Sequence, residues 1–166
     1  MKWIIDGHNL IPHVRGLSLA DIDDEQALID LLNQFCRIKR DHALVFFDRA
    51  APGQSGERGF GLVKGIFVPS SQTADAAIAA YLQKRGSRAR NETLVSSDRM
   101  VQAAARPLHM HVISADVFAR QIEAALNQAP IAEVEKPLSD EEVLRWEQLF
   151  NQSHNQGETQ TRSSEE

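Results

Sequence analysis

The sequence predicts an α/β protein, a three-layer α/β/α sandwich whose mainly parallel sheet of five strands is covered by helices on both faces. Short apolar runs alternate along the chain with longer segments whose apolar residues recur at helical spacing, a pattern typical of parallel sheets. The chain of 166 residues is 42% hydrophobic and 25% charged. This composition is ordinary for one globular domain, and it excludes collagen-like and wholly disordered proteins.

The first half of the chain accounts for three of the five strands. The leading run is apolar up to Asp6, and the acidic start and basic end of residues 24–39 suit the dipole of a helix. The second and third strands have no evident helix between them, so a long loop rich in Gly, Pro and Arg is expected there. In order, these elements are strand 2–6, loop 7–21, helix 24–39, strand 43–48, loop 49–61 and strand 62–68.

The second half of the chain has clearer helix signals. Thr73 can cap a helix that ends near Arg85, and Pro107 stops the helix that follows Asp98. A further amphipathic pattern begins at Ala115. In order, these elements are helix 73–85, basic turn 86–92, strand 93–97, helix 99–106, strand 109–114 and helix 115–126.

The residues after the sheet domain, which is expected to span 1–126, differ in composition. Residues 127–150 are predicted to form a linker and a short helix, and that helix either packs on the domain or mediates docking or homodimer formation. Residues 151–166 are polar and lack an apolar period, so we expect a disordered tail. The net charge of −5 arises from residues 139–166, so it does not exclude a nucleic-acid partner for the neutral remainder.

The sequence also predicts a cytoplasmic protein. Its single cysteine, Cys36, excludes an internal disulfide and a Cys-rich zinc site. No apolar run approaches the roughly 20 residues that span a bilayer, so no membrane association is expected. Asp6 interrupts the leading apolar run, and we therefore expect no signal peptide.

Four aspartates are predicted to share one edge of the sheet. Asp6 and Asp48 end the first two strands, Asp98 follows the fourth, and Asp75 lies in the first turn of the helix after the third. Ligands of open parallel sheets bind beyond the carboxyl ends of the strands, where these residues would meet. An aspartate at the end of a strand is more often a helix cap or turn residue, but the common edge of all four favours a site.

Such a group of carboxylates predicts a divalent cation. Two unit charges about 4 Å apart repel by roughly 4 kcal/mol at an effective dielectric constant of 20. Raised pKa values or a bound cation would relieve this repulsion. Carboxylate oxygens suit Mg²⁺ or Mn²⁺, which can activate water and stabilise charge on a phosphoryl group. The predicted metal ligands are Asp6, Asp48, Asp75 and Asp98.

Polar and basic residues flank these acids in the sequence. Asn9 could bond to Asp6 or to a phosphate, and Thr73 and Ser97 either cap helices or orient the carboxylates. Arginines beside an acidic metal centre would hold a polyanionic substrate, although a solvated basic turn is the alternative. The predicted substrate-binding residues are Asn9, Thr73, Ser97, Arg49, Arg58, Arg88, Arg90 and Arg99.

The order of these motifs resembles the YacP-like NYN domain family, a branch of the PIN-like nucleases. The resemblance covers roughly residues 2–126, and its first, third and fourth segments are the most specific. The segments are IIDGHNLI (4–11), LVFFDR (44–49), TADAAI (73–78), LVSSDRMVQAAAR (94–106) and HVISADVFAR (111–120).

The resemblance implies a PIN-like, Rossmann-like sandwich and metal-dependent ribonuclease activity on RNA. Asp6, Asp48, Asp75 and Asp98 match the acidic motif positions, and Asn9 matches the family's asparagine. Together, these residues predict an endoribonuclease that leaves 5′-phosphate and 3′-hydroxyl ends. His8 is given no catalytic role, because many relatives have a histidine or an aromatic residue there.

Two other functions remain open from the sequence. Many relatives have a second acidic residue after the third aspartate, where this chain has Ala76, and this departure favours a catalytically weak protein that binds RNA or the ribosome. A small-molecule phosphatase is the other alternative, but the chain has neither a DxDxT nucleophile segment nor a GxxxxGK[ST] phosphate loop. A dinucleotide enzyme is disfavoured because no GxGxxG motif follows the first strand.

Overall fold

The computed structural model describes residues 2–19 and 23–128. The short helix expected within residues 127–150 and the tail expected at 151–166 lie outside the described residues, as does most of the expected linker. No helix within the described part of the chain is both long and apolar enough to traverse a bilayer.

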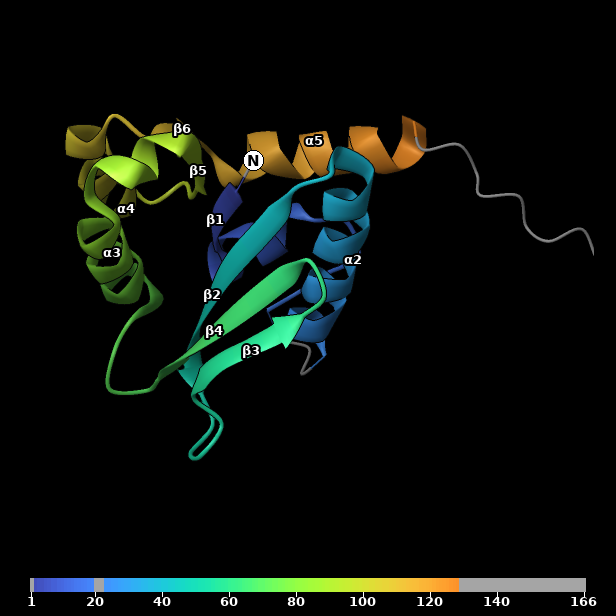
Figure 1. Ribbon diagram of the computed structural model, residues 1–166. Helices are drawn as coiled ribbons and strands as arrows, with labels where there is room; N and C mark the ends of the chain where they lie inside the picture. Colours follow the sequence, from blue (N-terminus) through green and yellow to red (C-terminus); the bar gives the residue numbers. More distant parts are fainter. Residues whose placement is uncertain (1, 20–22, 129–166) are drawn as a thin grey trace, which may run out of the picture. The chain divides into compact units, whose positions relative to one another are not determined.

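The fold is an α/β sandwich around one sheet, as predicted (Figure 1). The strand order is β3-β4-β2-β1-β5-β6, and every neighbouring pair is parallel except β3 and β4. Strands β1, β2 and β5 lie at the centre and are almost continuously buried, as expected for strands covered on both faces. The strands are β1 (Lys2–Asp6), β2 (His42–Ala50), β3 (Gly56–Phe60), β4 (Val63–Pro69), β5 (Glu92–Val95) and β6 (His111–Ile113).

The predicted number of five strands is wrong by one, because β3 lies in the segment 49–61 that was expected to be a loop. This strand pairs antiparallel with β4 at the edge of the sheet. Its sequence, GERGF, is exposed except at Phe60 and carries no alternating apolar pattern. An edge strand that buries almost no side chain gives no period-two signal, so its backbone pairing was not visible from the sequence.

Two helices cover each face of the sheet (Figure 1). One face packs against α2 (Asp24–Lys39) and α5 (Ala115–Gln128), around contacting rings of Trp3, Phe35 and Phe118. The other packs against α3 (Ala74–Arg85) and α4 (Arg99–Ala105). These helices begin and end within three residues of their predicted bounds.

Residues 7–13 are helical, whereas a loop was predicted for 7–21. Helix α1 (Gly7–Leu10) begins directly after β1, and the 3₁₀ turn η1 (Ile11–His13) continues from it. The Asp6 side chain caps α1 by accepting a hydrogen bond from the Asn9 backbone N–H at 3.3 Å. A helix of four residues is too short to show a periodic pattern, so local capping rather than amphipathicity determines it.

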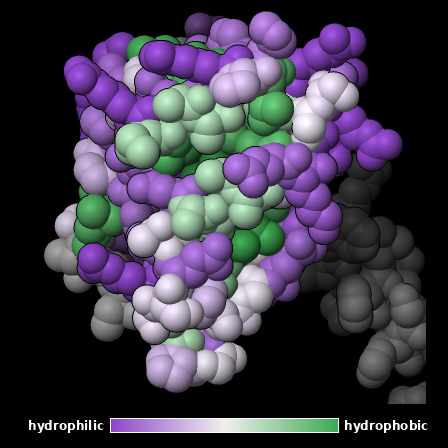
Figure 2. Space-filling model, turned by 90° about the vertical axis from the view of Figure 1, so that its left-hand side faces the viewer, coloured by the Kyte–Doolittle hydropathy of each residue, from purple (hydrophilic) through white to green (hydrophobic). Residues whose placement is uncertain are grey.

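The solvent side of α3 and α4 is largely apolar. Ala80, Ala103 and Met100 are exposed there, and Met100 is 78% exposed. Figure 2 views the molecule from this side and shows hydrophobic atoms in the middle of the face with hydrophilic atoms around them. The middle of this face therefore offers few polar groups to a polyanion.

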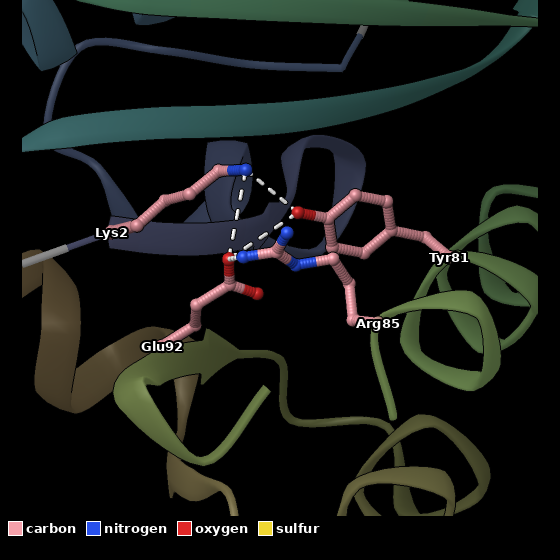
Figure 3. A network of polar contacts seen from close by, with 4 residues as sticks. All are labelled: Lys2, Tyr81, Arg85 and Glu92. Carbon is pink, nitrogen blue, oxygen red and sulfur yellow. Dashed lines mark hydrogen bonds and ion pairs between the residues drawn. The ribbon is translucent and has the colours of Figure 1, made fainter. Parts of the chain in front are cut away.

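The amino edge of the sheet is closed by a buried ion-pair network (Figure 3). Glu92, at the start of β5, is 3% exposed and accepts a hydrogen bond from Arg85 at 2.5 Å. Lys2, at the start of β1, donates to the Tyr81 hydroxyl at 2.7 Å and lies 3.7 Å from Glu92. The network ties the end of α3 to the starts of two central strands, so it stabilises the edge opposite the aspartates.

Candidate functional site

The structure brings the four predicted aspartates to the carboxyl edge of the sheet. Asp6 ends β1, and Asp48 lies near the end of β2. Asp75 is in the first turn of α3, and Asp98 caps α4 by accepting hydrogen bonds from the N–H groups of residues 100 and 101. All four therefore lie where ligands of parallel α/β sheets bind.

Their carboxylates interact with one another. Asp6 is 5% exposed, and its pKa is raised to about 6, chiefly by burial and further by the charges of Asp75 and Asp48, against the Asn9 hydrogen bond. The pKa of Asp75 is raised as well, chiefly by burial and then by the charges of Asp98 and Asp48, while a hydrogen bond with Asp6 opposes the shift. Each of the four aspartates thus raises the pKa of another or has its own pKa raised by another.

The donor chemistry of this cluster fits a hard divalent cation such as Mg²⁺ or Mn²⁺. Its carboxylate oxygens are the ligands these ions prefer, and negative charge held in a buried position favours neutralisation by a cation. Within residues 2–19 and 23–128, however, no three His, Cys, Asp or Glu side chains lie close enough together to form a ready-made metal site. The four acids therefore lie at the same edge and influence one another electrostatically, but they do not form a closed coordination shell.

The raised pKa of Asp6 predicts a pH-dependent stability. The folded state binds the Asp6 proton more tightly than the unfolded state, so this residue's contribution is most favourable below about pH 4 and is lost as the pH rises toward 6. We expect the free energy of unfolding of Asp6→Asn, measured relative to wild type, to increase by about 2 kcal/mol between pH 4 and pH 7. Denaturant unfolding of both proteins in EDTA across this range measures the difference, and a constant difference would contradict the assignment.

A bulge in β2 presents Asp48. The pairing of β2 with β4 shifts between Phe47 and Ala50, and Arg49 has a positive φ of 60°. Bulges bend a strand and change the direction of its side chains, and they are frequent near active sites. Here the residues in the bulge are Asp48 and Arg49, which place a carboxylate and an exposed cation next to each other at the edge.

His8 joins two carboxylates, although the sequence interpretation gave it no role. Its Nδ1 atom forms a hydrogen bond with Asp48, and its Nε2 atom lies 3.0 Å from Glu25 Oε1. The pKa of His8 is raised, chiefly by the hydrogen bond with Glu25 and then by Asp48, although burial opposes this. The contacts favour the imidazolium form, which places a positive charge inside the acidic cluster. No sequence signal pairs position 8 with position 25, because α2 reaches His8 only in the folded chain.

Asn9 and Ser97 connect two elements of the site. The Asn9 side-chain oxygen accepts a hydrogen bond from the Ser97 N–H at 2.7 Å, across 88 positions of sequence. The Ser97 hydroxyl accepts from the N–H of Ala115 at 3.0 Å and thereby fixes the start of α5. Both oxygens accept hydrogen bonds from backbone N–H groups, so these residues fix the position of α1 relative to the segment before α4, and with it the positions of Asp6 and Asp98.

Thr73 is the N-cap of the helix that carries Asp75. Its hydroxyl accepts a hydrogen bond from the Ala76 N–H at 3.2 Å. We expect Thr73→Ala to lower the free energy of unfolding by about 1 kcal/mol, since one N–H of the first turn loses its partner. Urea denaturation measures this loss. Ser71→Ala, in the exposed turn before the helix, is the control, and equal losses in the two variants would exclude a capping role.

The predicted arginines fall in three places on the sheet. Arg49 and Arg99 are exposed at the carboxyl edge, whereas Arg58 is exposed in the middle of the lateral strand β3, where it pairs with Gly65 of β4. Arg88 and Arg90 lie in the 3₁₀ turn η2 (Gly86–Asn91), which leads into the start of β5 at the amino edge. The expectation that they lie beside the acids was wrong, because α3 is 12 residues long and therefore carries the chain about 18 Å away from Asp75.

Comparisons with known proteins agree with this architecture. A family model described as YacP-like NYN domain matches residues 3–157. The crystal structure of Rae1 (YacP) from Bacillus subtilis is 19% identical, with a TM-score of 0.64 and coverage of 99% of both chains. A crystal structure of a tryptophan-to-leucine mutant of Rae1 is 21% identical, with a TM-score of 0.60 and coverage of 76% of this chain and 77% of the other. No curated protein matches the chain.

Proposed function

Since the chain belongs to the YacP-like NYN domain family, a family of PIN-like nucleases, we propose that it is a divalent-metal-dependent endoribonuclease. The observation that carries the proposal is the mutual electrostatic perturbation of Asp6, Asp48, Asp75 and Asp98 at one sheet edge. Titratable groups whose pKa values are shifted by burial together with specific charged neighbours concentrate at functional sites.

The acids would hold Mg²⁺ or Mn²⁺, which when bound would activate water and stabilise negative charge on the phosphoryl group. Asp6 and Asp75 share a hydrogen bond and have raised pKa values, so this pair retains a proton to higher pH than isolated carboxylates do. Arg49 and Arg99 directly follow two of the acids in the sequence and are exposed. Their charges would attract the phosphate backbone to the edge at which the acids lie.

His8 is a positioning residue in this proposal. Its hydrogen bonds to Asp48 and Glu25 hold the Asp48 carboxylate from the side of α2, and its positive charge offsets part of the repulsion among the acids. A carboxylate fixed in this way loses less side-chain freedom when it binds a ligand. The same contacts link the acidic cluster to the surface between α2 and β2.

Cleavage of mixed RNAs with and without Mn²⁺, followed by end-group analysis, tests the proposal. Hydrolysis in which water attacks phosphorus leaves 5′-phosphate and 3′-hydroxyl ends, and EDTA should abolish it. Products with 2′,3′-cyclic phosphates would contradict this chemistry, because they require attack by the RNA's own 2′-hydroxyl.

A second candidate function is RNA or ribosome binding without cleavage. The observation in its favour is Ala76, which is exposed in the first turn of α3 directly after Asp75. An acid at this position would add one more oxygen ligand to the cluster. Weak Mn²⁺ affinity together with tight RNA binding and no turnover would support this second function over the first.

A further inference from the structure

A cavity of about 460 Å³ is lined by His8, whose Nδ1 atom forms a hydrogen bond with Asp48 of the acidic cluster. It lies between the start of α2, the bulge of β2 and the β3–β4 pair. Ligand sites for small organic groups have volumes of about 300–1,000 Å³. The residues of its wall that matter here are His8, Glu25, Arg49, Gln54, Arg58 and Phe67.

Arg58 presents a pre-positioned planar cation in this cavity. Its guanidinium carbon lies 4.8 Å from the centroid of the Phe67 ring, and one of its nitrogens donates to the Gln54 carbonyl at 2.6 Å. Phe67 is supported in turn by Phe47, whose ring is stacked on it at a centroid distance of 5.4 Å. A guanidinium held over a ring and by a backbone acceptor needs little further ordering to contact a ligand.

The charges of the cavity wall suit a ligand that has both an uncharged ring and a phosphate. Asp24 and Glu25 belong to the wall on the side of α2 and disfavour a buried phosphate. Arg49 and Arg58 lie on the side of β2 and β3, and both are exposed. A nucleotide matches this division, because its base is uncharged and its phosphate is anionic.

We propose that this cavity receives one unpaired nucleobase of the RNA next to the scissile phosphate, with the base stacked on the Arg58 guanidinium. The proposal rests on the proposed function, because the acidic cluster fixes where the phosphate lies. Proteins that bind single-stranded RNA commonly stack its bases on aromatic rings or arginine planes. A base paired within a duplex cannot enter the cavity, so the site selects single-stranded RNA.

Binding in EDTA tests the subsite without any cleavage. The probes are a fluorescein-labelled octamer of adenylate and an abasic octamer with the same backbone, and fluorescence anisotropy gives both affinities. We expect wild type to bind the adenylate octamer about tenfold more tightly than the abasic one. Arg58→Ala should bind both equally. Arg58→Lys keeps the positive charge but lacks the planar guanidinium, so it should also lose the preference for the adenylate octamer over the abasic one.

Arg37→Ala is the matched control, because Arg37 is exposed at the far end of α2. It should keep the wild-type preference. If Arg58 contacts only phosphate, Arg58→Ala weakens both probes equally and keeps the preference, which would overturn the proposal. A wild-type protein without any preference would overturn it too.

Separate experiments test the subsite and the proposed function. If Mn²⁺-dependent cleavage is absent, the proposed function fails, but the base preference in EDTA can still be measured. If the base preference survives Arg58→Ala, the subsite fails, but the result of the cleavage assay still stands. An RNA duplex that stays fully paired at the assay temperature provides a further check, since it should compete at least tenfold more weakly than the single strand. Equal competition by the duplex would refute an unpaired base as the occupant.

Discussion

Asp6→Asn is expected to cleave RNA at least about 10²-fold more slowly than wild type in saturating Mn²⁺. The substitution keeps the volume of the side chain and an acceptor for the Asn9 N–H, but it removes the charge from the most buried member of the cluster. Single-turnover cleavage of a labelled RNA measures the loss. Its expected gain in stability above pH 6 shows that the variant is folded.

Two further variants complete this test. Asp98→Asn should lose activity similarly, because Asp98 acts on Asp75 from the start of α4. Asp30→Asn is the matched control, since Asp30 is an exposed residue of α2 whose carboxylate accepts a hydrogen bond from Gln26 on the same helix. Wild-type, metal-dependent rates in Asp6→Asn and Asp98→Asn would remove both carboxylates from the mechanism.

Gly7→Ala is expected to lower the free energy of unfolding by about 2–3 kcal/mol. A Cβ atom at this position would lie 2.4 Å from the Phe47 ring and 3.0 Å from the Phe46 carbonyl oxygen. Either the ring or the start of α1 must move, and α1 carries His8 and Asn9, so RNA cleavage should fall as well. Guanidinium denaturation in EDTA and the cleavage assay measure the two effects.

Gly59→Ala is the control for this prediction. Gly59 lies in β3, and a Cβ atom there would meet nothing within 4 Å. Its substitution should change stability by less than about 0.5 kcal/mol. A Gly7→Ala protein as stable and active as Gly59→Ala would show that the contact of α1 with Phe47 is loosely packed.

The central part of the fold could be predicted because its signals are local. Buried strands such as β1 are short apolar runs, and α2 has an apolar face with charges placed to suit its dipole. The common edge of the aspartates followed from the parallel order of these strands. In contrast, β3 is determined by backbone pairing to β4, and α1 by a single cap, and neither leaves a pattern of side chains.

The candidate site could be predicted only where the direction of a strand determines the sheet edge at which a residue lies. Residues directly after a strand lie at the carboxyl edge, and this rule placed Asp6 and Asp98. Arg88 was misplaced because closeness in sequence to Asp75 was taken as closeness in space, although a helix separates them. The contact of His8 with Glu25 depends on how α2 packs on the sheet, which no spacing in the sequence reveals.

The dispersed origin of the acids has a thermodynamic consequence. Asp6, Asp48, Asp75 and Asp98 come from four separate elements that converge only when the central strands have paired. A partly folded chain therefore cannot bind a ligand of the acids. Such a ligand adds RT ln(1 + [L]/Kd) to the free energy of unfolding of the entire domain rather than to the stability of one loop. Protection from proteolysis should then rise across all elements together as the ligand is titrated.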